Sequence, residues 1–234
     1  MRLLLVALVA LAACGAAAAA GDAERGRALF RTQCSTCHGL DAKGVHDRGP
    51  SLEGVGAASA DFYLSTGRMP LDQPGRQPIR SDPAFGRGQI DDLVAYIASL
   101  GPGPPIPRVD TAEGDVALGQ RLFADRCAGC HQIVGRGGVV QDAFAPSLRD
   151  ATPTQVAEAV RVGPYVMPAF TRAQIDDAQL ASLVRYVERT QHPDDRGGWG
   201  IFEIGPVPEG MVTWLLAGAL LLGVIRLLGE RADE

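Results

Sequence analysis

A five-residue motif that occurs twice constrains this chain more than any other feature. Cys34-Ser35-Thr36-Cys37-His38 recurs as Cys127-Ala128-Gly129-Cys130-His131. Two cysteines three positions apart, followed by a histidine, form the pattern by which c-type haem is attached. Each thiol forms a thioether with the porphyrin, and the histidine becomes a ligand of the iron. The motifs predict two covalently bound haem c groups, on Cys34, Cys37, Cys127 and Cys130, with His38 and His131 as iron ligands.

Two other uses of a Cys-x-x-Cys pair fit less well. A zinc site needs further Cys or His ligands, and a thioredoxin-type dithiol does not require the histidine. The flanks also repeat, because Gly26 and Leu29-Phe30 precede Cys34 at the same offsets at which Gly119 and Leu122-Phe123 precede Cys127. An internal duplication explains this best.

Hydrophobic periodicity predicts similar helices in both copies. A helix over 22–31 is expected to pack, through Gly26, on a second helix over 89–97. The second copy closes with a helix over 173–187. The segment that joins the copies is rich in Pro, which predicts a stiff linker. The predicted boundaries are 21–101 for the first domain, 102–113 for the linker and 114–192 for the second domain.

The second axial ligand of each iron is predicted by elimination. Met69 and Met167 each precede a proline, some thirty residues beyond the haem-binding histidine of their own copy. His46 and His192 are the rivals, and both are expected at the surface. Ligation by His and Met raises the reduction potential and leaves no open site on the iron. The haems are therefore expected to carry electrons, and no catalytic residue is assigned.

Two loops beside the motifs carry further expectations. Pro50 and Pro146 follow the motifs at similar distances, and their carbonyl groups are candidate acceptors for the ring N–H of the proximal histidines. A simple turn is the alternative. The first copy also has an insert over 71–83 with two arginines. Loops that the core does not need often carry recognition, so this insert is expected to pack on a neighbouring subunit.

The N-terminal residues 1–20 resemble a secretory signal. One Arg precedes an apolar run that is too short to span a bilayer comfortably, and small residues follow. Cys14 lies in a stretch that resembles a lipoprotein processing site, so lipidation of Cys14 and ordinary cleavage further along both stay open. Either route predicts export.

A second apolar stretch, at 211–228, predicts a C-terminal transmembrane helix with Trp214 as an interfacial anchor. The preceding residues 193–210 are expected to be membrane-proximal and, because of their Gly and Pro content, not to form a continuous helix. With the haem domains exported, the tail at 229–234 is cytoplasmic and the protein is a single-pass protein of the cell membrane.

The net charge excludes some partners. The chain has a formal charge of -5 at pH 7 and contains a single lysine. This composition argues against nucleic-acid binding and against the lysine-rich docking face of a mobile cytochrome. Partners held in place by the membrane are favoured.

Several longer stretches resemble one family, the dihaem cytochrome c subunit of the actinobacterial cytochrome bc1 complex, a menaquinol–cytochrome c reductase. Besides the haem motifs, the resemblance rests on these stretches: Gly49-Pro50-Ser51-Leu52, Gly54-Val55-Gly56, Ser65-Thr66-Gly67-Arg68-Met69-Pro70, Gln89-Ile90-Asp91, Gly135-Arg136-Gly137-Gly138, Gly163-Pro164, Met167-Pro168 and Gly205-Pro206-Val207-Pro208-Glu209-Gly210-Met211. It covers nearly everything after Gly21. The short N-terminus departs from it.

The resemblance implies a mainly α fold, with two tandem class I cytochrome c domains and one C-terminal transmembrane helix. It also implies association with cytochrome b, a Rieske iron-sulfur protein and an aa3-type oxidase, to which the chain would relay electrons from the Rieske cluster. The chain would then be a subunit of an oxidoreductase without a substrate site of its own. A membrane-bound dihaem donor for another dehydrogenase or oxidase is the alternative, and a dihaem peroxidase is the next.

Overall fold

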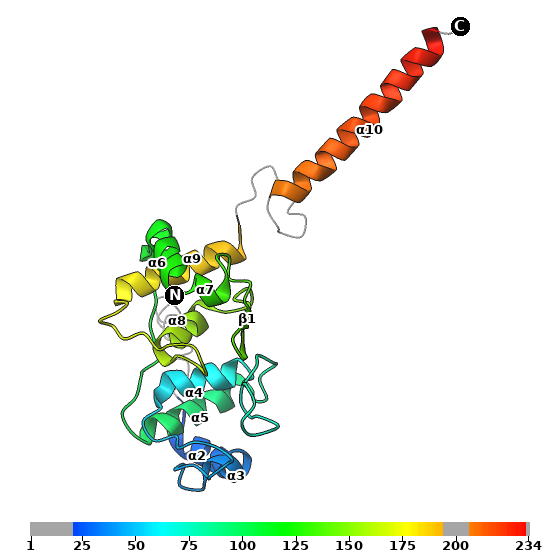
Figure 1. Cartoon of the computed structure of the whole chain (residues 1–234). Helices are drawn as coiled ribbons and strands as arrows, with labels where there is room; N and C mark the ends of the chain where they lie inside the picture. The colour runs from blue at the N-terminus through cyan, green and yellow to red at the C-terminus, as the bar shows by residue number, and fades with distance from the viewer. Residues whose placement is uncertain (1–20, 194–205, 233–234) are drawn as a thin grey trace, which may run out of the picture. The chain divides into compact units, whose positions relative to one another are not determined.

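The computed structural model describes residues 21–193 and 206–232 (Figure 1). Of the described residues, those from 21 to 191 form one compact unit, and those from His192 onward belong to a second. The expected signal segment with Cys14, most of the membrane-proximal segment and the last two residues of the tail lie outside the described residues.

Helices dominate the first unit. The first copy of the repeat consists of α2 (Ala23–Gln33), α3 (Ser35–His38), α4 (Gly56–Ser65) and α5 (Arg87–Ser99). The second copy consists of a short 3-10 helix η1 (Thr111–Glu113), α6 (Val116–Arg126), α7 (Ala128–His131), β1 (Gly138–Val140), β2 (Ala143–Ala145), α8 (Pro153–Val162) and α9 (Asp177–Gln191). The two strands pair antiparallel, with Gly138 opposite Ala145.

Helix α9 begins four residues later than the sequence pattern suggests. Asp176 caps its first turn, because the N–H of Gln179 donates to the Asp176 carboxylate at 2.8 Å and the Gln179 side chain accepts from the Asp176 N–H at 3.0 Å. This reciprocal pair is a capping box, which satisfies two backbone donors at a helix start. The residues before Asp176 therefore form turns.

Glycines set the distance between the first and last helices of each copy. A Cβ atom placed on Gly26 would lie 1.9 Å from the carbonyl oxygen of Asp92 in α5, and one on Gly119 would lie 2.0 Å from that of Ser182 in α9. No side chain fits at such distances, so the backbones meet directly. The expected packing through Gly26 is confirmed, and the second copy repeats it.

An aromatic pair fills the space beyond each glycine. Phe30 and Tyr96 lie with ring centroids 5.2 Å apart, and Phe123 and Tyr186 lie 5.3 Å apart, both in tilted arrangements. Phe30 and Phe123 are fully buried. Tilted aromatic pairs at this separation add to the stability that burial of their area provides.

The insert of the first copy reaches the second copy of the same chain. The side-chain amide of Gln77 donates to the Phe144 carbonyl oxygen at 2.7 Å and accepts from the Phe144 N–H at 2.9 Å. Arg80 donates to the Asp150 carbonyl oxygen at 2.7 Å and to Gln155 at 3.1 Å. These two side chains are engaged within the chain, and the expected contact of the insert with a neighbouring subunit stays a prediction.

Two acidic side chains meet where α4 packs on α8. Asp61 and Glu158 are both buried, and Arg87 lies 2.6 Å from the Asp61 carboxylate. Neither carboxylate oxygen of Glu158 makes a hydrogen bond of ordinary geometry with the described residues. Burial, and next to it the interaction with Asp61, raise the pKa of Glu158 to about 9, although the positive charge of Arg87 acts to lower it. Glu158 is therefore protonated at neutral pH.

The linker is held against the first copy. The N–H of Ala58 donates to the Pro104 carbonyl oxygen at 3.0 Å. A Cβ atom on Gly56 would lie 2.5 Å from the Pro104 nitrogen, so the two backbones touch here as well. This contact and the prolines together restrain the linker, as the composition predicts.

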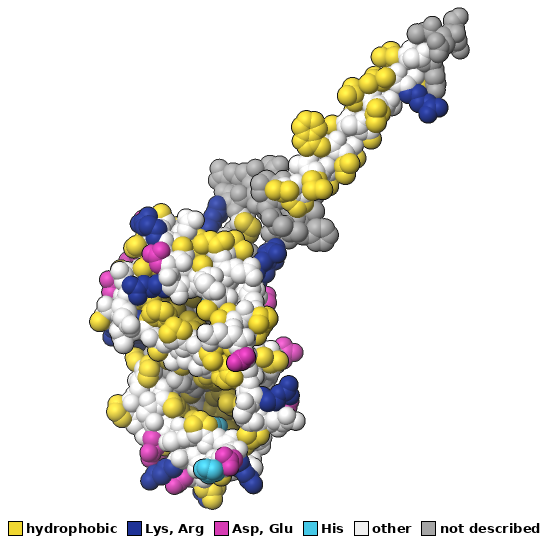
Figure 2. All heavy atoms as spheres, in the orientation of Figure 1, with side chains coloured by type: hydrophobic (Ala, Val, Ile, Leu, Met, Phe, Trp, Pro, Cys, Tyr) yellow, Lys and Arg dark blue, Asp and Glu magenta, His cyan; other side chains and the backbone are white. Residues whose placement is uncertain are grey.

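The second unit contains the helix α10 (Pro206–Ala232), which includes an apolar span over Val207–Gly229 with mean hydropathy 2.1. At 1.5 Å per residue the 23 residues of the span reach about 35 Å, enough to cross a bilayer core. Figure 2 shows hydrophobic side chains along its length. The expectation that the residues before Met211 interrupt the helix is wrong for Pro206–Gly210, because prolines in a first turn need no hydrogen-bonded N–H.

The glycine contacts generate a stability prediction. Gly26→Ala and Gly119→Ala should each lower the free energy of unfolding by about 1–3 kcal/mol, because the added methyl group forces the helices apart. Denaturant titration of the haem-loaded chain measures the loss. Gly88→Ala in α5 is the matched control, since a Cβ there meets nothing within 4 Å. Equal stability of the control and the two variants would contradict the role given to these contacts.

The acidic pair generates a prediction for pH. The unfolded chain releases the Glu158 proton near the ordinary value of 4.5, whereas the folded chain keeps it to about 9. The folded state binds more protons across this window, so its stability falls as the pH rises, by at most ~1.4 kcal/mol per pH unit. Glu158→Gln should flatten the decline between pH 6 and 9 in denaturant titrations. The exposed Glu113→Gln is the control, and an unchanged slope in Glu158→Gln would refute the prediction.

Candidate haem sites

The local backbone brings the cysteines and the histidine of each motif together. Helix α2 ends at Gln33, and Cys34 turns the chain into the single turn of α3. The N–H groups of Cys37 and His38 both donate to the Cys34 carbonyl oxygen, at 3.1 and 3.0 Å. Cys127 makes the same turn with Cys130 and His131, at 3.1 and 2.9 Å. Both motifs therefore have one geometry.

All four motif cysteines have free thiols. Burial is the main cause that raises the pKa values of Cys34 and Cys127 to about 11 each. Among residues 21–193 and 206–232, no group of three or more His, Cys, Asp or Glu side chains is placed to hold a metal ion. The arrangement does not fit the zinc alternative, and thiols that are neither paired nor clustered suit thioether attachment.

The ring of each proximal histidine lies against the expected proline carbonyl group. Nδ1 of His38 lies 2.9 Å from the Pro50 oxygen, and Nδ1 of His131 lies 3.1 Å from the Pro146 oxygen. A carbonyl oxygen only accepts, so Nδ1 carries a hydrogen and Nε2 is the ring nitrogen left to bind a metal. Burial lowers the pKa of His131, which favours the neutral ring. Neutral rings held in this way are suited to bind iron through Nε2.

Equivalent turns hold the two proline carbonyl groups in place. The Leu52 N–H donates to the Ala42 carbonyl oxygen at 2.8 Å, and the Leu148 N–H donates to that of Gly135 at the same distance. Ala42 and Gly135 both have a positive φ, of 60° and 67°. A Cβ atom on Gly49 would lie 2.8 Å from the Cys37 carbonyl oxygen, so the first loop closes tightly on its motif.

Both candidate methionine ligands lie in loops that follow a helix of their copy. Met69 and Met167 are half-buried, and Met167 packs against the core of the second copy. The N–H of Met69 donates to the Tyr63 carbonyl oxygen at 3.1 Å. The rival His46 has a side chain that is 94% exposed, and His192 is exposed too. Both rivals are surface residues, as expected.

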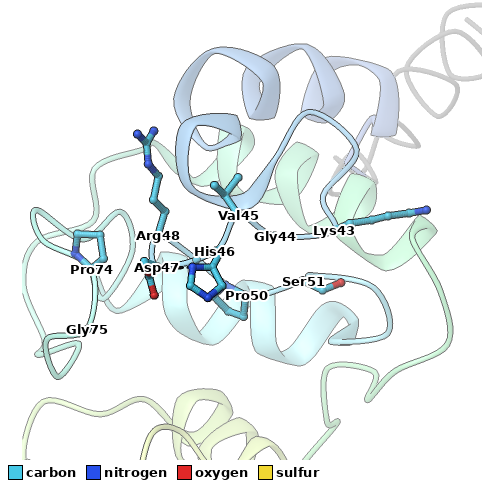
Figure 3. A pocket seen from close by; sticks show the side chains of 11 residues that line it. Lys43, Gly44, Val45, His46, Asp47, Arg48, Pro50, Ser51, Pro74 and Gly75 are labelled. Carbon is cyan, nitrogen blue, oxygen red and sulfur yellow. Dashed lines mark ion pairs between the residues drawn. The ribbon is translucent and has the colours of Figure 1, made fainter.

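A pocket of about 690 Å³ opens beside the first motif (Figure 3). The loop from Lys43 to Ser51 lines it on one side, and Pro74 and Gly75 of the insert line it on the other. Pro50, which accepts from His38, belongs to this lining. Figure 2 shows hollows with hydrophobic side chains on the visible face of the first unit.

Sequence reasoning missed Arg68, which is buried directly before Met69. Its Nη1 has no hydrogen-bond partner among the described residues. In the sequence, the special place of Arg68 could have been found from its contrast with Val166, the residue before Met167 in the second copy. A haem is an apolar macrocycle that carries two carboxylates. The site fits such a group, because it offers free thiols, oriented imidazole rings and a buried cation whose Nη1 has no hydrogen-bond partner among the described residues.

Comparison with known proteins agrees with this geometry. A family model described as cytochrome c matches residues 23–101, and one described as cytochrome c oxidase, cbb3-type, subunit III matches residues 114–187. The chain is 37% identical over 218 residues to the cytochrome bc1 complex cytochrome c subunit of Mycobacterium leprae, covering 88% of this chain and 75% of that protein. The subunit of the same name from Corynebacterium diphtheriae is 33% identical, with 89% and 81% covered.

A relative from a different complex is also similar. The cbb3-type cytochrome c oxidase subunit CcoP of Rhodobacter capsulatus is 30% identical over 189 residues, covering 69% of this chain and 60% of that protein.

The fold and the two matched models define a protein with two cytochrome c domains and one candidate transmembrane helix. Two such domains support two covalently bound haem c groups. More particularly, the chain belongs to the family of cytochrome c subunits of the cytochrome bc1 complex, the quinol–cytochrome c reductase.

The histidine contact generates a prediction for the first haem. Gly49→Ala should push the Pro50 carbonyl group away from His38 and make the imidazole a weaker donor to iron. Loss of a hydrogen bond worth ~1 kcal/mol should raise the potential of one haem by about 40 mV and leave the other unchanged. Redox titration of the haem absorbance measures the shift. Gly88→Ala is the control, and two unchanged potentials in Gly49→Ala would contradict the prediction.

Proposed function

We propose that this chain relays electrons from a Rieske iron-sulfur protein, through two haems with His and Met ligands, to a terminal aa3-type oxidase. The observation that carries the proposal is the duplicated arrangement of two free thiols and a carbonyl-bound imidazole within one compact unit. Each bound haem iron supplies one-electron oxidation and reduction.

The residue assignments follow the two copies. Cys34 and Cys37 hold the first haem, and Cys127 and Cys130 hold the second. The axial ligands are His38 with Met69 in the domain at 21–101, and His131 with Met167 in the domain at 114–192. A methionine ligand closes the iron and raises its potential, so the chain carries electrons without a substrate site.

Contacts between the two copies suit a relay, because they restrain the relation between the two haem sites. Gln77 and Arg80 join the insert to the second copy, and α4 packs on α8. Electron transfer needs no large motion when both sites belong to one packed body. The linker at 102–113 contributes, since Pro104 is bonded to the first copy.

The membrane assignment rests on α10 and on the chemistry of the cofactor. The apolar span over Val207–Gly229 anchors the chain in the cell membrane. Haem c is attached outside the cytoplasmic membrane in bacteria, so the haem domains lie on the extracytoplasmic side and the C-terminus is cytoplasmic. The segment at 1–20 directs export, by cleavage or by lipidation at Cys14.

The partners follow from the family. The name of these relatives, cytochrome bc1 complex cytochrome c subunit, supports assembly with a cytochrome b and a Rieske subunit. With one lysine, the chain does not have the lysine-rich docking face of a mobile cytochrome, which favours an oxidase held beside it in the membrane as the acceptor.

A second candidate function is that of a dihaem donor subunit within an oxidase. The match of residues 114–187 to the cbb3-type subunit III model and the similarity to CcoP favour it. The same axial ligands would serve, but the electrons would enter from a different partner.

Purification of the full chain in mild detergent separates the two candidates. The proposal expects cytochrome b and a Rieske protein to copurify with two high-potential c haems, and aa3-type oxidase subunits to accompany them. Mass spectrometry identifies the partners, and a redox titration counts the haems. Recovery of a cbb3-type catalytic subunit without cytochrome b would favour the second candidate instead.

The methionine assignments have a test of their own. Met69→His and Met167→His should each lower the potential of one haem, on the order of 0.2 V within the roughly 0.8 V range that axial ligands command. Spectroelectrochemical titration of the full chain reports both haems at once. Met211→His, in α10, is the control. If a variant leaves both haem potentials unchanged, the methionine that it replaces is not an iron ligand.

A further inference from the structure

We infer that the Arg68 guanidinium binds a propionate carboxylate of the first haem, next to the boundary between the two copies. The inference deepens the proposed function and rests on its assignment of a haem to Cys34 and Cys37. It gives the first haem a cationic partner at a place where the second copy has Val166.

Arg68 is a buried cation without an acceptor. Its residue is only 7% exposed, and Nη1 has no hydrogen-bond partner among residues 21–193 and 206–232. Burial of an unpaired charge is costly, and native proteins pair such groups with an opposite charge. The site therefore requires an anion that the described side chains do not supply.

A second cation near Arg68 increases this requirement. Arg80 lies close enough to repel the Arg68 guanidinium. Arg80 is already engaged by the Asp150 carbonyl oxygen and by Gln155, which are neutral acceptors. Two cations thus lie near each other at the boundary between the copies, an arrangement that favours an anionic ligand.

The geometry of the side chain leaves its donors available. The guanidinium carbon lies 4.8 Å from the centroid of the Phe62 ring in α4. A cation over an aromatic face is stabilised, but the interaction uses the face of the guanidinium and none of its N–H groups. The edge with Nη1 can still form the paired hydrogen bonds that a carboxylate accepts from arginine.

The position of Arg68 in the chain points to a propionate. Arg68 precedes Met69, the proposed iron ligand, so its backbone lies at the rim of the same haem. A haem brings carboxylates to this rim as part of the cofactor. In the second copy the equivalent residue is Val166, which is 65% exposed and has no charge. The inferred contact therefore distinguishes the two haems.

The contact has a consequence for the potentials. A propionate beside the iron favours the ferric state, because its negative charge stabilises the more positive iron. A buried guanidinium that neutralises this propionate shifts the balance toward the ferrous state. Arg68 should therefore raise the potential of the first haem relative to the second.

Arg68→Gln in the haem-loaded full chain tests the inference. The reduction equilibrium of one haem should become about tenfold less favourable, a fall of 59 mV for one electron. Arg68→Lys, which keeps the charge, should recover most of the loss. Val166→Gln is the matched control in the second copy and should leave the first potential unchanged. Unchanged potentials in Arg68→Gln, with two haems still attached, would overturn the inference.

Two further measurements cover the remaining outcomes. A cryo-EM map of the wild-type chain in its complex should place a propionate oxygen within hydrogen-bond distance of the Arg68 guanidinium, even if Arg68→Gln fails to fold. A propionate directed elsewhere, or a wild-type potential that changes with phosphate concentration because a free anion fills the site, would refute the inference. Fewer than two haems per wild-type chain would instead refute the proposed function and, with it, this contact.

Discussion

Direct contact between the first and last helices of each copy is the constraint on which the rest of the structure depends. At Gly26 and Gly119 the backbones meet with no room for a side chain, and each contact positions the first turn of the helix that leads into a haem motif. The single turn after that helix then presents two thiols and an imidazole in one arrangement. A side chain at either glycine would displace the whole motif, because the helix before it moves as a rigid element.

The boundary between the copies combines neutral and charged contacts with different roles. Gln77 and Arg80 bind backbone groups and an amide, so their contacts are insensitive to pH. Asp61 and Glu158, by contrast, place two buried acids side by side, and the pair is tolerated because Glu158 holds a proton and Arg87 neutralises Asp61. The Arg68 cation, whose Nη1 has no hydrogen-bond partner among the described residues, lies near Arg80 and over the Phe62 ring of α4. Charge at the boundary is thus only partly balanced by the protein itself.

The repeat has kept its backbone while its side chains have diverged. Ala42 stands where Gly135 stands in the second copy, with the same left-handed conformation, and both are bonded to the leucine that follows the proline loop. Arg68 and Val166, in contrast, share a place before the methionine but differ in charge and burial. Under the proposed relay, equivalent turns with different neighbours would give the two haems different potentials, which suits one-way electron transfer.

The sequence by itself determined the duplication, the helices that flank each motif, the histidine contacts with Pro50 and Pro146, and the apolar span, because each depends on spacing or periodicity within a short stretch. It misplaced the start of α9 and the start of α10, where Asp176 and the first-turn prolines act through local bonds that hydrophobic periodicity does not register. Only the tertiary structure decided that the insert binds the second copy, that Glu158 meets Asp61 and that Arg68 is left without an acceptor. These contacts involve residues that are far apart in the chain. Burial sets the energies of the charged groups, and the groups become buried only once the two copies have packed together.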